Sequence, residues 1–139
     1  MRRKGSVLLM EDDPGTAGTT MALIESLGYS ATWVRDRNEA LFALSATRID
    51  VIMLDLIMPR LDGLFVLEHL QRTKSHLLAR VILTTGIPDR YIDNLDRGRI
   101  CAVIEKPLDA GQLERLLDHC AARVHLPSAG AGEVPELFD

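Results

Sequence analysis

The chain has 139 residues, a formal net charge of −4 and hydrophobic side chains at 47% of its positions. This length predicts one domain whose buried core needs no metal or disulfide, and the acidic balance excludes a global positive field for nucleic acid. No apolar run approaches the roughly 18 residues of a membrane span, and no signal-peptide core follows the basic N-terminus. Cys101 and Cys120 show neither metal-ligand nor redox spacing, so we expect reduced thiols in a cytoplasmic protein.

Short apolar runs alternate with amphipathic stretches along the chain. We predict strands at residues 7–10, 30–34, 51–55, 81–84 and 100–104, and helices starting at Pro14, after Asp36, at Asp62-Gly63, at Pro88 and after Asp109. The helix of residues 88–96 is polar and should be the least firmly docked. In the helix that starts at Asp62-Gly63, we expect Leu64, Leu67 and Leu70 to face the sheet.

This alternation predicts an α/β fold. Short connections and right-handed crossovers favour a flavodoxin-like, doubly wound sheet of five parallel strands in the order 2-1-3-4-5, with helices on both faces. The first and third strands are then neighbours at the topological switch point. Ligands of such sheets bind there, beyond the carboxyl ends of the strands.

Polar residues follow four of the predicted strands and should meet at that edge. Glu11 and Asp12 follow the first strand, Asp55 ends the third, Thr85 follows the fourth, and Lys106 follows the fifth. Two carboxylates about 4 Å apart repel by about 4 kcal/mol at an effective dielectric constant near 20, so the site needs a cation. Oxygen ligands together with water suit Mg²⁺.

The motifs Glu11-Asp12, Asp55-x-x-Met58-Pro59-x-x-Asp62-Gly63, Thr85-Gly86 and Lys106-Pro107 together resemble the receiver domain of two-component response regulators. They occur in that family's order and at close to its spacing, and the resemblance covers roughly residues 6–124. Taken singly, each motif is explained as well by a turn, a helix cap or a solvated charge. Their joint occurrence at four strand ends favours a functional site.

The resemblance implies a role for each motif residue. Asp55 would be the phosphoacceptor. Mg²⁺ would bind Asp12 and Asp55 directly, Glu11 through water, and the backbone carbonyl of Ile57. The remaining residues would contact the phosphoryl group (Thr85, Gly86, Lys106) or shape the loops (Pro59, Gly63, Pro107, the last with a cis bond to Lys106).

The same resemblance implies partners and a mode of action. A histidine kinase or phosphotransfer protein would supply the phosphoryl group, and a downstream protein would read a docking surface that includes residues 88–108. A second copy of the chain is a further candidate partner, whereas nucleic acid and membrane are not expected. Apart from its own phosphorylation and dephosphorylation, the domain would not act as an enzyme.

Two departures from the family pattern affect this reading. Val103 stands three residues before Lys106, where receivers usually carry Tyr or Phe, so an aromatic switch is not expected there; Tyr91 is an alternative. Ile57 and Ile87 occupy positions that gate water and small donors. We expect these apolar side chains to shield an acyl phosphate and slow its hydrolysis.

We divide the chain into a flexible leader (1–5), a receiver domain (6–125) and a disordered tail or linker remnant (126–139). The domain would act alone or come from a larger response regulator or hybrid kinase. Among other classes, a phosphatase with an aspartate nucleophile would need a second aspartate where Ile57 stands, and a flavodoxin-like cofactor binder would not place acids after its first strand. A receiver fold without the chemistry is disfavoured by Asp55, Thr85 and Lys106.

Overall fold

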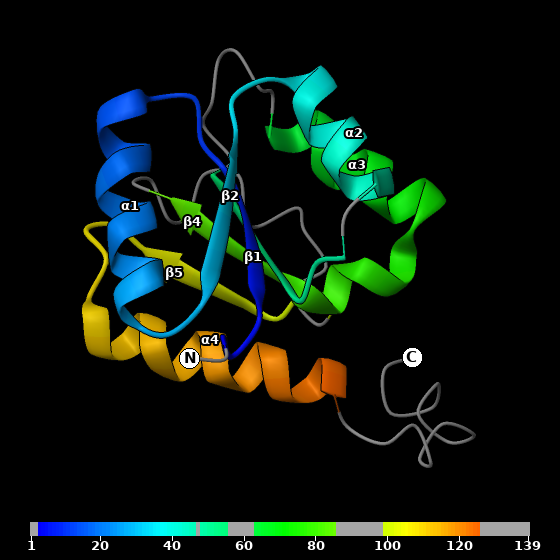
Figure 1. Cartoon of the computed structure of the whole chain (residues 1–139). Helices are drawn as coiled ribbons and strands as arrows, with labels where there is room; N and C mark the ends of the chain where they lie inside the picture. Colours follow the sequence, from blue (N-terminus) through cyan, green and yellow to red (C-terminus); the bar gives the residue numbers. More distant parts are fainter. Residues whose placement is uncertain (1–2, 47, 56–62, 86–98, 126–139) are drawn as a thin grey trace.

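The computed structural model describes residues 3–46, 48–55, 63–85 and 99–125. It contains a five-stranded parallel sheet in the order β2-β1-β3-β4-β5, which confirms the predicted fold (Figure 1). The elements are β1 (Ser6–Met10), α1 (Pro14–Ser26), β2 (Ser30–Val34), α2 (Arg37–Ala46), β3 (Val51–Asp55), α3 (Gly63–Thr73), the 3₁₀ helix η1 (Ser75–Arg80), β4 (Val81–Thr85), β5 (Ala102–Glu105) and α4 (Ala110–His125).

Strand β3 lies at the centre of the sheet, between β1 and β4. All five of its residues are buried, as expected for a continuous apolar run with helices on both faces. Met10 pairs with Leu54, and Asp55 pairs with Thr84, so the carboxyl ends of β1, β3 and β4 are level. The register therefore brings the polar residues that end these strands to one edge.

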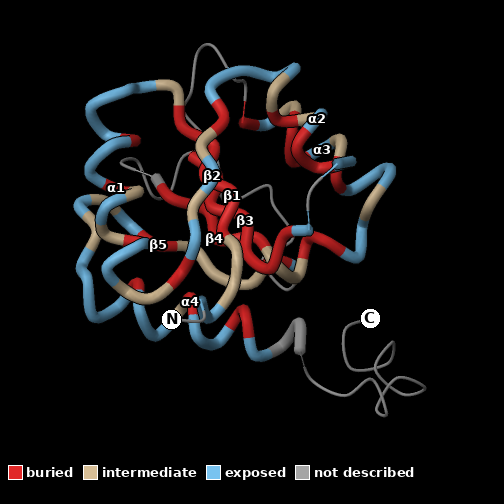
Figure 2. Tube along the Cα trace, in the orientation of Figure 1, coloured by how far each residue is buried: buried red, intermediate tan, exposed pale blue. Residues whose placement is uncertain are grey.

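Helices cover both faces of the sheet. Helices α1 and α4 lie on one side and α2 and α3 on the other, and the buried positions face the strands between them (Figures 1 and 2). The largest fully buried side chains belong mostly to the strands and include Leu8, Met10, Ile52, Met53, Leu54, Ile82 and Leu83. This packing makes the sheet a rigid support for the residues at its edge.

Aspartates cap three of the helices, as the sequence indicates. Asp13 accepts a hydrogen bond from the backbone N–H of Thr16 at 2.7 Å, and Pro14 follows as the first helical residue. Asp36 accepts from Glu39 in the same way at 2.8 Å, and Asp109 from Gln112 at 2.7 Å. These caps fix where α1, α2 and α4 leave the loops of the polar edge.

Some expected details differ from the structure. Leu64 was expected to face the sheet, but 37% of its surface is exposed. The buried stripe of α3 consists of Gly63, Val66, Leu67 and Leu70, and Leu64 lies beside that stripe. The expected helix of residues 88–96 lies outside the described residues. So does the tail of residues 126–139.

Residues 3–5 belong to the expected flexible leader, yet they are bonded to the domain. The backbone N–H of Lys4 donates to the carbonyl of Gly28 at 2.8 Å, and its ammonium lies 2.8 Å from Asp118. The carbonyl of Gly5 accepts from the backbone N–H of Ser30. These contacts continue the chain pairing beyond the first residue of β1, toward the N-terminus.

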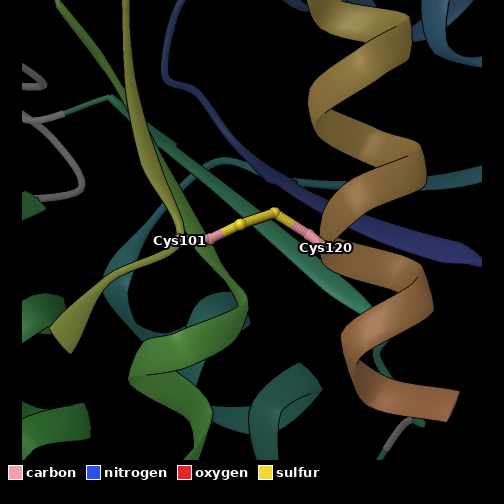
Figure 3. Close-up of a disulfide and its surroundings, with 2 residues drawn as sticks. All are labelled: Cys101 and Cys120. Atoms are coloured by element: carbon pink, nitrogen blue, oxygen red, sulfur yellow. A yellow bond between two sulfur atoms is a disulfide. The ribbon is translucent and has the colours of Figure 1, made fainter. Parts of the chain in front are cut away.

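The expectation of reduced cysteines is wrong, because Cys101 and Cys120 form a disulfide (Figure 3). Cys101 immediately precedes β5 and Cys120 lies in α4, which packs against that strand. Their Cα atoms are 6.3 Å apart, within the range that a disulfide spans. The 19-residue separation gives no sign of this proximity, which arises because α4 runs back along β5.

No helix in the part of the chain that the structure describes is both long enough and apolar enough to cross a membrane.

Candidate functional site

Three charged side chains meet at the carboxyl edge of the sheet. Glu11 directly follows β1, Asp55 ends β3, and Lys106 directly follows β5. The adjacency of β1 and β3 brings the two carboxylates together, whereas Lys106 reaches them from the edge strand. The chain thus assembles this cluster from segments 44 and more residues apart, as the predicted strand order requires.

The ammonium of Lys106 bridges the two carboxylates. Its Nζ donates to Oδ2 of Asp55 at 2.5 Å and lies 3.6 Å from Oε1 of Glu11. Both acids are buried, each with 6% of its surface exposed, while 30% of the lysine side chain remains exposed. The lysine therefore approaches from the solvent side and neutralises charge that the sheet has buried.

The surroundings shift the pKa values of Glu11 and Lys106. Burial raises the pKa of Glu11, and a hydrogen bond from the backbone N–H of Asp13 and the charge of Lys106 offset this only in part. Burial by itself would lower the pKa of Lys106. The hydrogen bond to Asp55 and the charges of Asp55 and Glu11 outweigh burial and raise that pKa, so the ammonium stays charged.

Backbone contacts hold the acidic loop after β1. The N–H of Glu11 donates to the carbonyl of Val34 at 3.2 Å, and the indole N–H of Trp33 donates to the carbonyl of Glu11 at 2.6 Å. Sequence reasoning missed the role of Trp33. The available signal was its place as the one tryptophan of the chain, near the end of the strand that pairs with β1.

Asp12 lies between Glu11 and the helix cap Asp13 and is half-buried. Within the described ranges, no group of three or more acidic, histidine or cysteine side chains is arranged to bind a metal ion.

Other predicted site residues are placed only in part. Thr85 ends β4, opposite Glu105 of β5, and Gly63 is buried as the first residue of α3. The bond between Lys106 and Pro107 is cis. Ile57, Pro59 and Gly86 lie outside the described residues. Val103 is half-buried and packs against the core on the side of α2 and α3.

A cleft of about 560 Å³ opens beside the charged cluster. Its walls are the first half of α1, with Gly15, Thr16 and Thr19, and the loop from Lys106 to Leu108. Small and hydroxyl-bearing residues on α1 leave this space open. Sequence reasoning did not identify the cleft, although it shares Lys106 with the predicted site.

The sequence matches one protein family and several of its curated members. Residues 7–118 match the family model of the response regulator receiver domain. The response regulator MprA of Mycolicibacterium vanbaalenii is 33% identical over 129 residues, which cover 91% of this chain and 54% of that protein. The chain spans about half or less of the length of the first curated relatives it matches.

Solved receiver structures share the fold. The signal receiver domain of a signal transduction histidine kinase from Syntrophus aciditrophicus is 30% identical, with a TM-score of 0.76 over 88% of this chain and 94% of that chain. The receiver domain of a sensor histidine kinase from Pseudomonas aeruginosa is 24% identical, with a TM-score of 0.74 over 85% and 98%. That second structure has a magnesium ion coordinated in its active site cleft.

Proposed function

Because this chain belongs to the response regulator receiver domain family, we propose that it is a phosphoacceptor of a two-component phosphorelay. A histidine kinase or phosphotransfer protein would donate the phosphoryl group in the cytoplasm, and Asp55 would accept it. The observation that carries the proposal is the contact of Lys106 with both Asp55 and Glu11 at the carboxyl edge of the sheet.

Asp55 is suited to nucleophilic attack. It ends a fully buried strand, and the Lys106 ammonium donates a hydrogen bond to it. A carboxylate oxygen would attack phosphorus, and the bond from phosphorus to the donor's nitrogen would break, with its electron pair remaining on that nitrogen. Lys106 would then donate to the phosphoryl oxygens, whose charge it offsets.

The acidic residues fit a bound Mg²⁺. Carboxylate oxygens suit this hard cation. The three carboxylates of Glu11, Asp12 and Asp55 carry more negative charge than the single ammonium of Lys106 balances. Asp12 and Asp55 would hold the ion directly and Glu11 through water, with the carbonyl of Ile57 as a further ligand. When bound, Mg²⁺ would neutralise charge between Asp55 and the incoming phosphoryl group.

The resulting change would be electrostatic. A phosphoryl group adds about −1.5 to −2 charges at neutral pH, next to a lysine carried by the β5–α4 loop. Rearrangement around Lys106 and Thr85 would then alter a surface that a partner protein reads. The domain would therefore work as a switch, with turnover limited to its own phosphate.

Intact-mass analysis after incubation with Mg²⁺ and acetyl phosphate tests the proposal. We expect a gain of one phosphoryl group that requires Mg²⁺ and is absent from Asp55→Asn. Asp36→Asn is the matched control, since it replaces an exposed carboxylate by an amide that still caps α2, and it should be labelled normally. Equal labelling of Asp55→Asn and the unmodified protein would contradict the assignment. Failure of both acetyl phosphate and a phosphorylated histidine donor to label the unmodified protein would also contradict it.

A further inference from the structure

The disulfide closes a loop that contains the lysine of the candidate site. Cys101 precedes β5 and Cys120 lies in α4 (Figure 3). The segment between them in the sequence includes Lys106. We propose that Cys101 and Cys120 form a reversible thiol–disulfide site that sets how firmly this segment holds Lys106 against Asp55 and Glu11. The predicted effect on phosphorylation rests on the proposed function, but the effect on the segment does not.

The two cysteines differ in burial. Cys120 is fully buried in the core, whereas Cys101 is half-buried at the end of the edge strand. A small thiolate would therefore attack the sulfur of Cys101, and Cys120 would leave as a thiolate that takes up a proton. A second thiol then attacks the external sulfur of the mixed disulfide and releases Cys101 as a thiol. Overall, two thiols are oxidised to one disulfide, and the protein disulfide is reduced to two thiols.

The fold should survive this reduction. Cys120 belongs to the core on the α1 and α4 side, and Cys101 packs against the same core, so both remain apolar packing groups as thiols. Leu113 and Leu117 still anchor α4 on the sheet, and the N–H of Cys101 still donates to the carbonyl of Val81 at 2.9 Å. The bond is therefore an added constraint on a segment that is already packed.

The constraint acts on the edge of the sheet. Strand β5 is an edge strand that pairs with β4 alone, over four residues. Opening the disulfide removes the covalent tie at its first end, and the Lys106 loop follows at its other end. Motion of β5 against α4 would then reach the contacts of the lysine with the two acids.

The cytoplasmic location that the proposed function assumes favours a switch over a permanent bond. Disulfides there are usually transient and act in redox chemistry or sensing, because dithiol proteins and glutathione reduce accessible ones. Cys101, the less buried of the two cysteines, is the entry point that we expect for such reductants. The predicted reductant class is a low-molecular-weight thiol or a dithiol protein.

Hydrogen exchange of the folded full chain, oxidised and after treatment with dithiothreitol, tests the proposal together with maleimide mass tagging. After reduction we expect one maleimide tag without denaturant, on the half-buried Cys101, and a second tag, on the buried Cys120, only in denaturant. We also expect amide exchange in residues 102–113 at least about tenfold faster than in the oxidised protein. Peptides from β1 and α2 should exchange at the same rate in both states. Cys101→Ser is the matched control, and its exchange should match the reduced protein and not respond to dithiothreitol.

Two results would overturn the proposal: thiols that form only in denaturant, or identical exchange of residues 102–113 in the oxidised and reduced protein. Labelling with acetyl phosphate is a separate readout, in which the oxidised and reduced proteins should differ at least about threefold in rate. Absence of labelling in both states would count against the proposed function alone, since the tagging and exchange results stand without it. Labelling at equal rates would refute the coupling to the site.

Discussion

Removing the Lys106 ammonium and the Asp55 charge, separately and together, measures how strongly the site is coupled. Point charges at the observed separations of 2.5 and 3.6 Å attract by about 7 and about 5 kcal/mol at an effective dielectric constant near 20. Desolvation costs several kcal/mol per ion and cancels most of this attraction. Because 30% of the lysine side chain stays exposed, we expect a net coupling of about 2 kcal/mol between Lys106 and Asp55.

The assay is denaturant unfolding, without Mg²⁺, of the unmodified protein, Lys106→Met, Asp55→Asn and the double variant. Lys106→Met keeps the apolar stem and leaves two buried carboxylates without their cation, so it should destabilise the fold. The control cycle uses Arg35 and Glu39, a pair that is 60% and 39% exposed and should couple by less than about 0.5 kcal/mol. A coupling at Lys106 and Asp55 no larger than this control would refute the reasoning.

Three further predictions follow from the structure. Mg²⁺ should change the fluorescence of Trp33, because its indole N–H donates to the carbonyl of Glu11. Asp12→Asn should weaken or abolish that response. A Mg²⁺ titration curve of Asp12→Asn identical to that of the unmodified protein would contradict the metal assignment. Leu70→Ala should lower the free energy of unfolding by about 3 kcal/mol, because Leu70 is fully buried; a loss below about 1 kcal/mol in denaturant titration would mean that the site collapses around the cavity. Hydrogen bonds, first from Lys4, lower the pKa of Asp118. The carboxylate therefore stabilises the fold above the unfolded pKa near 4, and this contribution is lost as the pH falls through the folded pKa. Thermal unfolding should show that Asp118→Asn destabilises the protein by less than about 1 kcal/mol at pH 6 and not at pH 2.

The fold was predictable because its signals are local. Four-residue apolar runs between amphipathic helices specify parallel strands buried on both faces, and the crossover rule then leaves few strand orders. The same order makes Glu11 and Asp55 neighbours. Their contact with Lys106 required only that all strands run parallel, so that their carboxyl ends meet at one edge.

The details that were not predictable depend on packing between distant segments. The disulfide needs α4 to return along β5 with Cys120 on its inner face, and no spacing rule gives that distance. Leu64 lies three residues before Leu67, but the buried stripe of α3 starts at Gly63, which leaves Leu64 beside it and partly exposed. The bond from Trp33 depends on a side chain reaching from β2 across the end of β1.

Chemical localisation of the phosphoryl group tests the central claim most directly. After incubation with Mg²⁺ and a phosphodonor, borohydride reduction converts an acyl phosphate on an aspartate into homoserine, which peptide mass mapping locates. We predict homoserine at position 55, formed only when Mg²⁺ and the donor are both present. Homoserine at another aspartate, or a phosphoryl group that resists borohydride and maps to a hydroxyl side chain, would contradict the account.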